Sequence, residues 1–143
     1  MRFLLDTNVL SELRKHGAGR ADPSVVRWAG RRDVNDMYLS VLTVQEIAFG
    51  VRRLDRRDPR QAGVLRSWLH GDILVTYVGR ILPVDTEIAL EAARVLADAS
   101  TSLGDAFIAA TALVHRLTVA TRNTAHFERV RSLAIVNPWE YAG

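Results

Sequence analysis

Short apolar runs alternate along the chain with stretches in which apolar residues recur at helical spacing. Compact apolar runs bounded by polar or turn residues are typical of buried strands. Pro83 lies within one of these runs and places it at a sheet edge or a strand end, because proline cannot donate to a ladder hydrogen bond. The runs that predict strands cover residues 2–5, 37–41, 81–84, 117–121 and 134–136.

Between these runs the apolar side chains recur every three or four residues, which predicts amphipathic helices. The clearest repeat extends from Val44 through Ile47 and Val51 to Leu54. The segment from Asp105 to about residue 114 is apolar almost throughout, so we expect that helix to be buried on several sides. The predicted helices cover about residues 7–14, 24–29, 44–54, 61–77, 85–99 and 105–114.

Strands that alternate with helices predict an α/β fold with a mainly parallel sheet and helices on both of its faces. We expect a single domain over residues 1–143, because the chain contains no internal repeat, low-complexity tract or linker and its length fits one core. In such a sheet, ligands bind at the carboxyl ends of the strands, beside a switch in strand order.

The composition excludes several kinds of site. The chain is 48% hydrophobic and 24% charged, as in ordinary folded proteins. It contains no cysteine, which rules out disulfides, thiolate zinc sites and a cysteine nucleophile and is compatible with the reducing cytoplasm, where we expect this protein. The first residues reach an acid at Asp6, too early for a signal peptide. No apolar stretch approaches the roughly 18 residues of a membrane helix, so we expect no membrane association.

The net charge is +3, and all basic residues except Lys15 are arginine. Arginine binds phosphate bidentately and therefore fits a nucleic-acid partner, although a biased codon composition explains the same content. The densest basic run covers residues 52–60. Because Asp55 and Asp58 are interspersed there, we interpret it as a solvated helix end in preference to an RNA-binding track.

Three carboxylates stand where a strand or loop gives way to a helix, and each has an ordinary structural explanation. Asp6 fits a helix N-cap. Glu46 completes a capping box with Thr43, three residues before it. Asp105 lies in the first turn of a helix, where the macrodipole favours a carboxylate, and Ser102 can cap the same helix.

Taken together, Asp6, Glu46 and Asp105 predict a metal site. Parallel strands would bring them to one edge of the sheet, where like charges repel and a divalent cation relieves the repulsion. An all-oxygen set suits Mg²⁺ or Mn²⁺, and such an ion activates water for phosphodiester hydrolysis. We therefore predict that these three are metal ligands and catalytic residues. The histidines lack metal-ligand spacing, and we assign them to the surface or to packing: His16, His70, His115 and His126.

A fourth polar segment leaves the strand predicted over residues 117–121. Thr121 and Asn123 carry oxygens that can position a metal-bound water, and we include Asn123 among the catalytic candidates. The alternative is a polar turn in which Asn123 forms an Asx turn or caps the next helical turn. Arg122 is placed to touch a phosphate. Asn8 and Thr43 are weaker candidates for supporting roles.

These segments, in this order, resemble the motifs of PIN-domain ribonucleases. The most similar branch is the VapC toxins of type II toxin–antitoxin systems, especially their FitB-like members. No single motif is decisive, but the ordered set is specific and spans nearly the whole chain. The segments that carry the resemblance are residues 4–13, 40–50, 105–112, 121–127 and 136–139.

The resemblance implies a three-layer PIN-like domain with a mainly parallel sheet of about five strands flanked by helices. It implies a magnesium- or manganese-dependent endoribonuclease that acts as a toxin on RNA, pairs with a second copy of itself and is blocked by a VapB-like antitoxin. Asp6, Glu46 and Asp105 fall on the family's acidic ligand positions. Asn123 stands nearest to a fourth position that is acidic in many members, which puts a second metal ion in doubt.

Two alternatives stay open. A PIN-like domain that binds RNA or protein without cutting is compatible with Asn123 at the fourth position. A metal enzyme of another specificity, such as a phosphatase or a DNA nuclease, would use the same carboxylates. A Rossmann or flavodoxin-like cofactor binder is disfavoured, because no G-x-G-x-x-G follows the first strand.

Overall fold

The computed structural model describes all residues, 1–143, and contains a five-stranded sheet in which every pairing is parallel. The order of the strands is β3-β2-β1-β4-β5. This confirms the predicted parallel α/β architecture, and it places the strand that precedes Pro83 at an edge. The strands are β1 Phe3–Leu5, β2 Met37–Ser40, β3 Ile81–Leu82, β4 Thr118–Ala120 and β5 Ile135–Val136.

The helices follow the predicted periodicity with one interruption, and none of them combines the length and apolar character needed to cross a bilayer. The helix expected over residues 61–77 is divided by a π-helical segment, whose wider turn changes the face that points inward. The α-helices are α1 Thr7–Arg14, α2 Pro23–Gly30, α3 Val41–Asp55, α4 Pro59–Trp68, α5 Leu74–Thr76, α6 Thr86–Asp98 and α7 Leu103–His115. The shorter segments are η1 Lys15–Ala18, η2 Val34–Asp36, the π-helical η3 Leu69–Ile73, η4 Thr124–His126 and η5 Pro138–Glu140.

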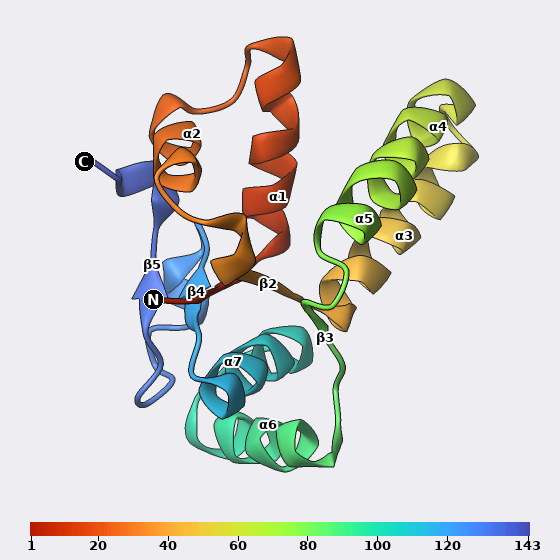
Figure 1. Cartoon of the computed structure of the whole chain (residues 1–143). Helices are drawn as coiled ribbons and strands as arrows, with labels where there is room; N and C mark the ends of the chain where they lie inside the picture. Colours follow the sequence, from red (N-terminus) through yellow and green to blue (C-terminus); the bar gives the residue numbers. More distant parts are fainter.

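Side-chain alternation along β1 divides the core into two layers around the sheet. Leu4 packs with buried residues of α6 and α7 on one face. Phe3 and Leu5 pack on the other face with residues of α1, α2, α3 and η3. Figure 1 shows α6 and α7 together on one side of the sheet, α1 and α2 on the other, and α3 and α4 as an adjacent pair. The predicted three-layer arrangement is confirmed.

Every helix of eight or more residues begins at a capping Asp or Ser whose side-chain oxygen accepts a backbone N–H. Such caps satisfy N–H groups that have no partner within the helix. They fix where each helix starts, and therefore which residues lie in its first turn. The caps are Asp6, Asp22, Ser40, Asp58, Asp85 and Ser102.

The start of α3 corrects one prediction. The helix begins at Val41 instead of Val44, because Ser40 Oγ accepts from Leu42 N at 3.0 Å. Thr43 consequently lies inside the first turn, and its buried hydroxyl has no hydrogen-bond partner. The capping-box interpretation of Thr43 and Glu46 is therefore wrong.

The order of the strands places a topological switch beside β1. The chain adds β2 and then β3 on one side of β1, and it returns to its other side with β4. The backbone pairing extends past the strand, since Asp6 N donates to Ala120 O at 3.0 Å. The carboxyl ends of β1 and β4 thus open side by side, which is where parallel α/β sheets bind ligands.

Removal of the Leu4 side chain tests the layered core. Leu4 is fully buried between the sheet and α7, so we expect Leu4→Ala to lower the free energy of unfolding by about 2–5 kcal/mol in urea denaturation. Leu90→Ala is the matched control, since that side chain is 69% exposed on α6 and should change stability by no more than about 0.5 kcal/mol. Equal losses in the two variants would contradict this placement of Leu4.

Candidate active site

A polar cavity of about 680 Å³ opens at the carboxyl edge of the sheet. The three carboxylates predicted from the sequence reach it from three different helices: Asp6 from the N-cap of α1, Glu46 from α3 and Asp105 from α7. Figure 1 shows the first turns of α1 and α3 approaching each other at the centre of the molecule. The cavity is lined by Asp6, Thr7, Asn8, Ser11, Leu42, Thr43, Gln45, Glu46, Gly104, Asp105, Ile108, Asn123 and His126.

Asp6 is held by three hydrogen-bond donors. Its Oδ1 accepts from the backbone N–H of Thr7 at 3.0 Å, which is the predicted N-cap. Its Oδ2 accepts from Thr121 Oγ1 at 2.8 Å and from Asn8 Nδ2 at 3.2 Å. The N-cap interpretation and the site interpretation of Asp6 are therefore compatible, because the carboxylate caps α1 while it faces the cavity.

The environment of Asp6 disfavours its negative charge. Burial raises the pKa of the Asp6 carboxyl above its ordinary value of 3.8, and the hydrogen bonds from Thr121 and Thr7 act in the opposite direction. The nearby carboxylates of Asp105 and Glu46 raise the pKa of Asp6 further. Like charges therefore meet in this cavity, which is the arrangement that a bound cation would stabilise.

The other two carboxylates each contact one oriented neighbour. Glu46 Oε2 accepts from Thr7 Oγ1 at 2.8 Å, so a residue of α1 orients a side chain of α3. Asp105 lies in the first turn of α7, where its backbone N–H donates to Ser102 Oγ at 3.2 Å. Its Oδ2 lies 3.3 Å from His126 Nδ1.

The fourth polar segment is only partly in the cavity. Thr121 is fully buried behind Asp6, and its Oγ1 also accepts from Asn123 N at 3.0 Å. Asn123 lines the cavity, and its side chain does not cap the following turn, so the capping alternative for Asn123 is wrong. Asn8 Oδ1 accepts from Arg122 N at 3.1 Å and ties this loop to α1.

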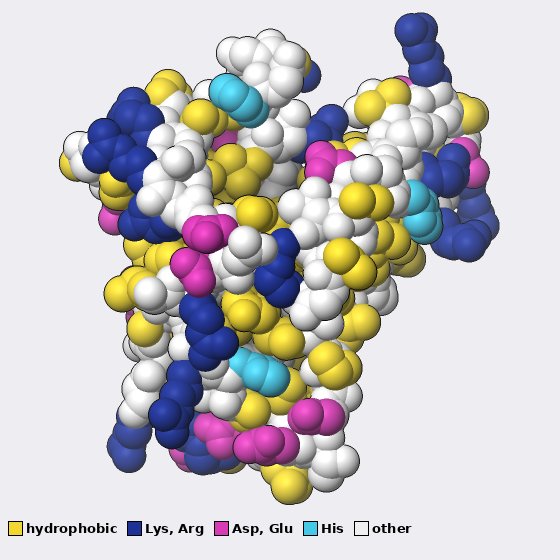
Figure 2. Space-filling view, in the orientation of Figure 1, with side chains coloured by type: hydrophobic (Ala, Val, Ile, Leu, Met, Phe, Trp, Pro, Cys, Tyr) yellow, Lys and Arg dark blue, Asp and Glu magenta, His cyan; other side chains and the backbone are white.

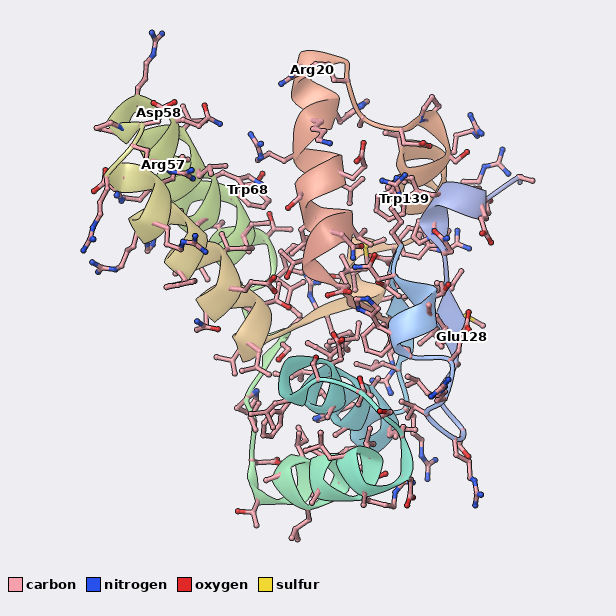
Figure 3. All side chains as sticks on the ribbon, turned by 180° about the vertical axis from the view of Figure 1, so that it is seen from behind. Arg20, Arg57, Asp58, Trp68, Glu128 and Trp139 are labelled. Atoms are coloured by element: carbon pink, nitrogen blue, oxygen red, sulfur yellow. The ribbon has the colours of Figure 1, made fainter.

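Arg122 does not line the cavity, although we predicted from the sequence that it contacts a phosphate of the substrate. Its guanidinium carbon lies 5.3 Å from the centre of the Trp139 ring, near the C-terminus. Cation–π contact with an aromatic face stabilises such a guanidinium. A direct contact between Arg122 and a phosphate in the cavity would require the Arg122 side chain to move away from the Trp139 ring. Trp139 is labelled in Figure 3.

His126 reaches the cavity, a position that was not predicted from the sequence. Its assignment to surface or packing is incomplete, since His126 lines the cavity and contacts Asp105 while its side chain stays 55% exposed. The signal that could have found it is its spacing. His126 lies three residues after Asn123 and ends the short turn η4, so both residues reach the same side of that turn.

The donor set fits a hard divalent cation. Oxygen atoms of Asp6, Glu46, Asp105 and Asn123 face one cavity, and the buried hydroxyl of Thr43 beside them lacks a partner. No three acidic or histidine side chains converge closely enough to enclose one ion by themselves. Water would complete the shell, as is usual for Mg²⁺.

Comparison with known proteins gives matches over nearly the whole chain. The family model described as PIN domain matches residues 3–133. The chain is 38% identical to VapC ribonuclease Y4jK of Sinorhizobium fredii over 98% of this chain and 99% of that protein. It is 41% identical to Toxin FitB of Neisseria gonorrhoeae over 96% of this chain and 98% of the toxin.

Solved structures give the same result. The crystal structure of FitAcB from Neisseria gonorrhoeae has a TM-score of 0.86 and 38% sequence identity, and covers 96% of this chain and 99% of that one. The structure of FitAB bound to the IR36 DNA fragment also has a TM-score of 0.86, with 36% identity and 96% of each chain covered. These matches confirm the resemblance that the ordered motifs predicted.

The raised pKa of Asp6 predicts a specific pH dependence in the metal-free protein. A carboxyl whose pKa is raised on folding binds its proton more tightly in the folded state. Its stabilising contribution is complete below the ordinary value of 3.8 and is lost as the pH rises through the folded-state pKa. Asp6→Asn keeps a capping side chain but cannot ionise. We therefore expect its free energy of unfolding to rise relative to that of the natural protein from about pH 4 upward.

The measurement is urea denaturation of both proteins in a chelating buffer at several values between about pH 4 and pH 7. The quantity that matters is the change with pH in the difference between the two free energies of unfolding, because effects of the substitution that do not involve the ionisation of Asp6 shift that difference by a constant amount. A difference that stays constant across this range would show that the ionisation of Asp6 is not disfavoured by the fold.

Proposed function

Since this chain belongs to the PIN-domain family, we propose that it is a metal-dependent endoribonuclease and the toxin of a type II toxin–antitoxin pair. One observation carries the proposal: Asp6, Glu46 and Asp105 line a single cavity with Asn123, at the topological switch of a parallel sheet. A relative named VapC ribonuclease, 38% identical over nearly the full chain, supports the reaction. The name Toxin FitB of another relative supports the biological role.

We propose that Asp6, Glu46 and Asp105 hold Mg²⁺ or Mn²⁺ together with water. A bound ion would lower the pKa of a coordinated water and offset negative charge that develops on the scissile phosphate. The oxygen-only character of the three side chains supports a hard cation. The neutral carboxamide of Asn123 adds no charge at the fourth position, so this chain has less negative charge for a second ion than a site with four acids.

The residues of the chain supply orientation. Thr121 and Asn8 fix Oδ2 of Asp6, and Thr7 fixes Glu46 through its hydroxyl. Donors of this kind orient the carboxylates of a metal site, and their loss typically costs about 10–100-fold in metal affinity or activity. Asp105, beside His126, is the residue we assign to proton removal through a water molecule.

The proposed partner in the cell is a VapB-like antitoxin that blocks the cavity. The likeness to structures titled FitAcB and FitAB supports a two-component assembly. The open, polar character of the cavity supports inhibition by an inserted segment, since an RNA strand and a peptide would compete for the same lining.

Substitution of the acids tests the reaction. We expect Asp6→Asn and Asp105→Asn each to lower RNA cleavage by at least about 100-fold, because loss of a partner around a metal ligand alone costs 10–100-fold. Asp98→Asn is the control, since Asp98 is exposed on α6 and pairs only with Arg94. DNA and small phosphate esters, incubated in parallel, distinguish the ribonuclease from a DNA nuclease or a phosphatase. Full cleavage by either site variant would defeat the proposal.

Metal binding can be measured without activity, and removal of the metal then tests the reaction. We expect Mg²⁺ or Mn²⁺ to raise the thermal midpoint of the natural protein, because a ligand that binds the folded state stabilises it. The same ions should leave the midpoint of Asp105→Asn nearly unchanged, and a chelator should abolish cleavage by the natural protein. Equal stabilisation of both proteins would exclude Asp105 as a ligand, and cleavage that persists in chelator would exclude a metal-dependent reaction.

Self-association stays a prediction. The family resemblance implies a homodimer, and sedimentation over a range of protein concentrations measures it directly. We expect a dimer in the absence of antitoxin. A monomer at every concentration would contradict this expectation and leave the proposed chemistry untouched.

A further inference from the structure

The C-terminal half of α3 and the two residues that follow it carry a cluster of exposed arginines around an aromatic ring. Four arginines and Phe49 line a shallow hollow of about 560 Å³ on the outer surface of this helix. Figure 2 shows basic side chains at the outer edge of the α3–α4 pair, and Figure 3 labels Arg57 where α3 ends. We call this hollow the arginine patch; its residues are Phe49, Arg52, Arg53, Arg56 and Arg57.

The acids that the sequence intersperses among these arginines do not pair with them. Asp55 lies 3.6 Å from Arg66 of α4. Asp58 caps α4 by accepting from Gln61 N at 3.1 Å. No ion pair within 4.0 Å involves any of the four arginines of the patch. The run does form an exposed helix end, as interpreted from the sequence, but its acids have other partners and leave the four guanidiniums available to an external anion.

Phe49 makes the arginine patch different from a simple basic surface. Its side chain is 54% exposed, although its ring is large and apolar. The guanidinium carbon of Arg53 lies 5.6 Å from the centre of this ring. Aromatic rings flanked by arginine are the elements with which proteins bind single-stranded nucleic acid, since the ring stacks on a base and the guanidiniums bind phosphates.

The arginine patch is continuous with the candidate active site. Glu46 and Arg53 lie on the same helix, seven residues and therefore about 10 Å apart along its axis. A groove of about 390 Å³ shares lining residues with both regions: Thr7 and Glu46 also line the cavity, and Arg57 also lines the arginine patch. A strand seated in the cavity can therefore continue along α3 to the arginine patch.

We infer that the arginine patch binds the single-stranded RNA that flanks the bond to be cut. The inference rests on the proposed ribonuclease function and adds a second contact region for the same substrate. Acidic segments of a protein would satisfy the guanidiniums equally well. RNA is favoured because it also supplies a base for Phe49 and because the patch is connected to the cavity in which the phosphodiester would lie.

The test is binding of a fluorescently labelled, 12-nucleotide single-stranded RNA in a chelating buffer, where the metal-dependent reaction is absent. The triple variant Arg52→Gln, Arg53→Gln, Arg56→Gln should bind at least about tenfold more weakly at 0.1 M salt. The slope of log affinity against log salt should become shallower by about 2, because each phosphate contact contributes about 0.7 for a single strand. A matched triple variant that removes the same charge from exposed positions elsewhere, Arg20→Gln, Arg129→Gln, Arg131→Gln, should stay within about twofold of the natural protein.

Phe49→Leu separates stacking from charge. This variant should bind the same RNA about fivefold or more weakly, with an unchanged salt slope, because no phosphate contact is lost. Leu90→Ala, an exposed apolar change on α6, should bind like the natural protein. With Mg²⁺ present, the arginine variant should show a raised KM for long RNA and an unchanged kcat.

Three results would overturn the inference. The first is a patch variant that keeps the affinity and salt slope of the natural protein. The second is a natural protein without measurable RNA binding in chelator. The third is a patch variant that keeps RNA binding but loses its antitoxin, which would make this a protein-docking surface. Each of these outcomes leaves the ribonuclease proposal to be judged separately by metal-dependent cleavage of RNA.

Discussion

The parallel pairing of β1 between β2 and β4 is the constraint on which the site depends. It places the carboxyl end of β1 in the middle of the sheet and sets the end of β4 beside it. Because the pairing extends to Asp6 N and Ala120 O, Thr121 is brought beneath the carboxylate of Asp6. The helices that start after β1 and β2 then open at the same edge, and each brings one carboxylate to the cavity, Asp6 at the start of α1 and Glu46 in α3.

Gathering like charges in this way is unfavourable, and the local structure offsets part of the cost. Asp6 and Asp105 lie at the N-cap and in the first turn of their helices. The partial positive charge of a helix N-terminus stabilises a carboxylate at such positions. Glu46 lies beyond the first turn of α3 and instead accepts a hydrogen bond from Thr7. Burial still raises the pKa of Asp6, and carboxyl groups with perturbed pKa values are typical of functional sites.

Helix α3 connects the two regions to which we assign function. Its first half contributes Glu46 to the cavity, and its second half, with the two residues that follow it, carries the arginine patch. The macrodipole favours this order, since cations are stabilised near a helix C-terminus. The arginines therefore need no acidic partners to be tolerated there. The same helix therefore holds one acid of the cavity and the arginine patch at a spacing set by its own rigid geometry.

The sequence by itself determined the order of the elements, the parallel sheet and which three acids line the cavity, Asp6, Glu46 and Asp105. Hydrophobic periodicity and the residues at helix starts are local signals, so they can be read without the tertiary structure. The sequence did not determine where α3 begins, since Ser40 and Thr43 both satisfy a capping pattern and only the end of β2 decides between them. Nor did it show that His126 reaches Asp105, or that Asp55 and Asp58 turn away from the nearby arginines. Those outcomes depend on the direction in which each side chain points, and packing between segments distant in the chain fixes that direction.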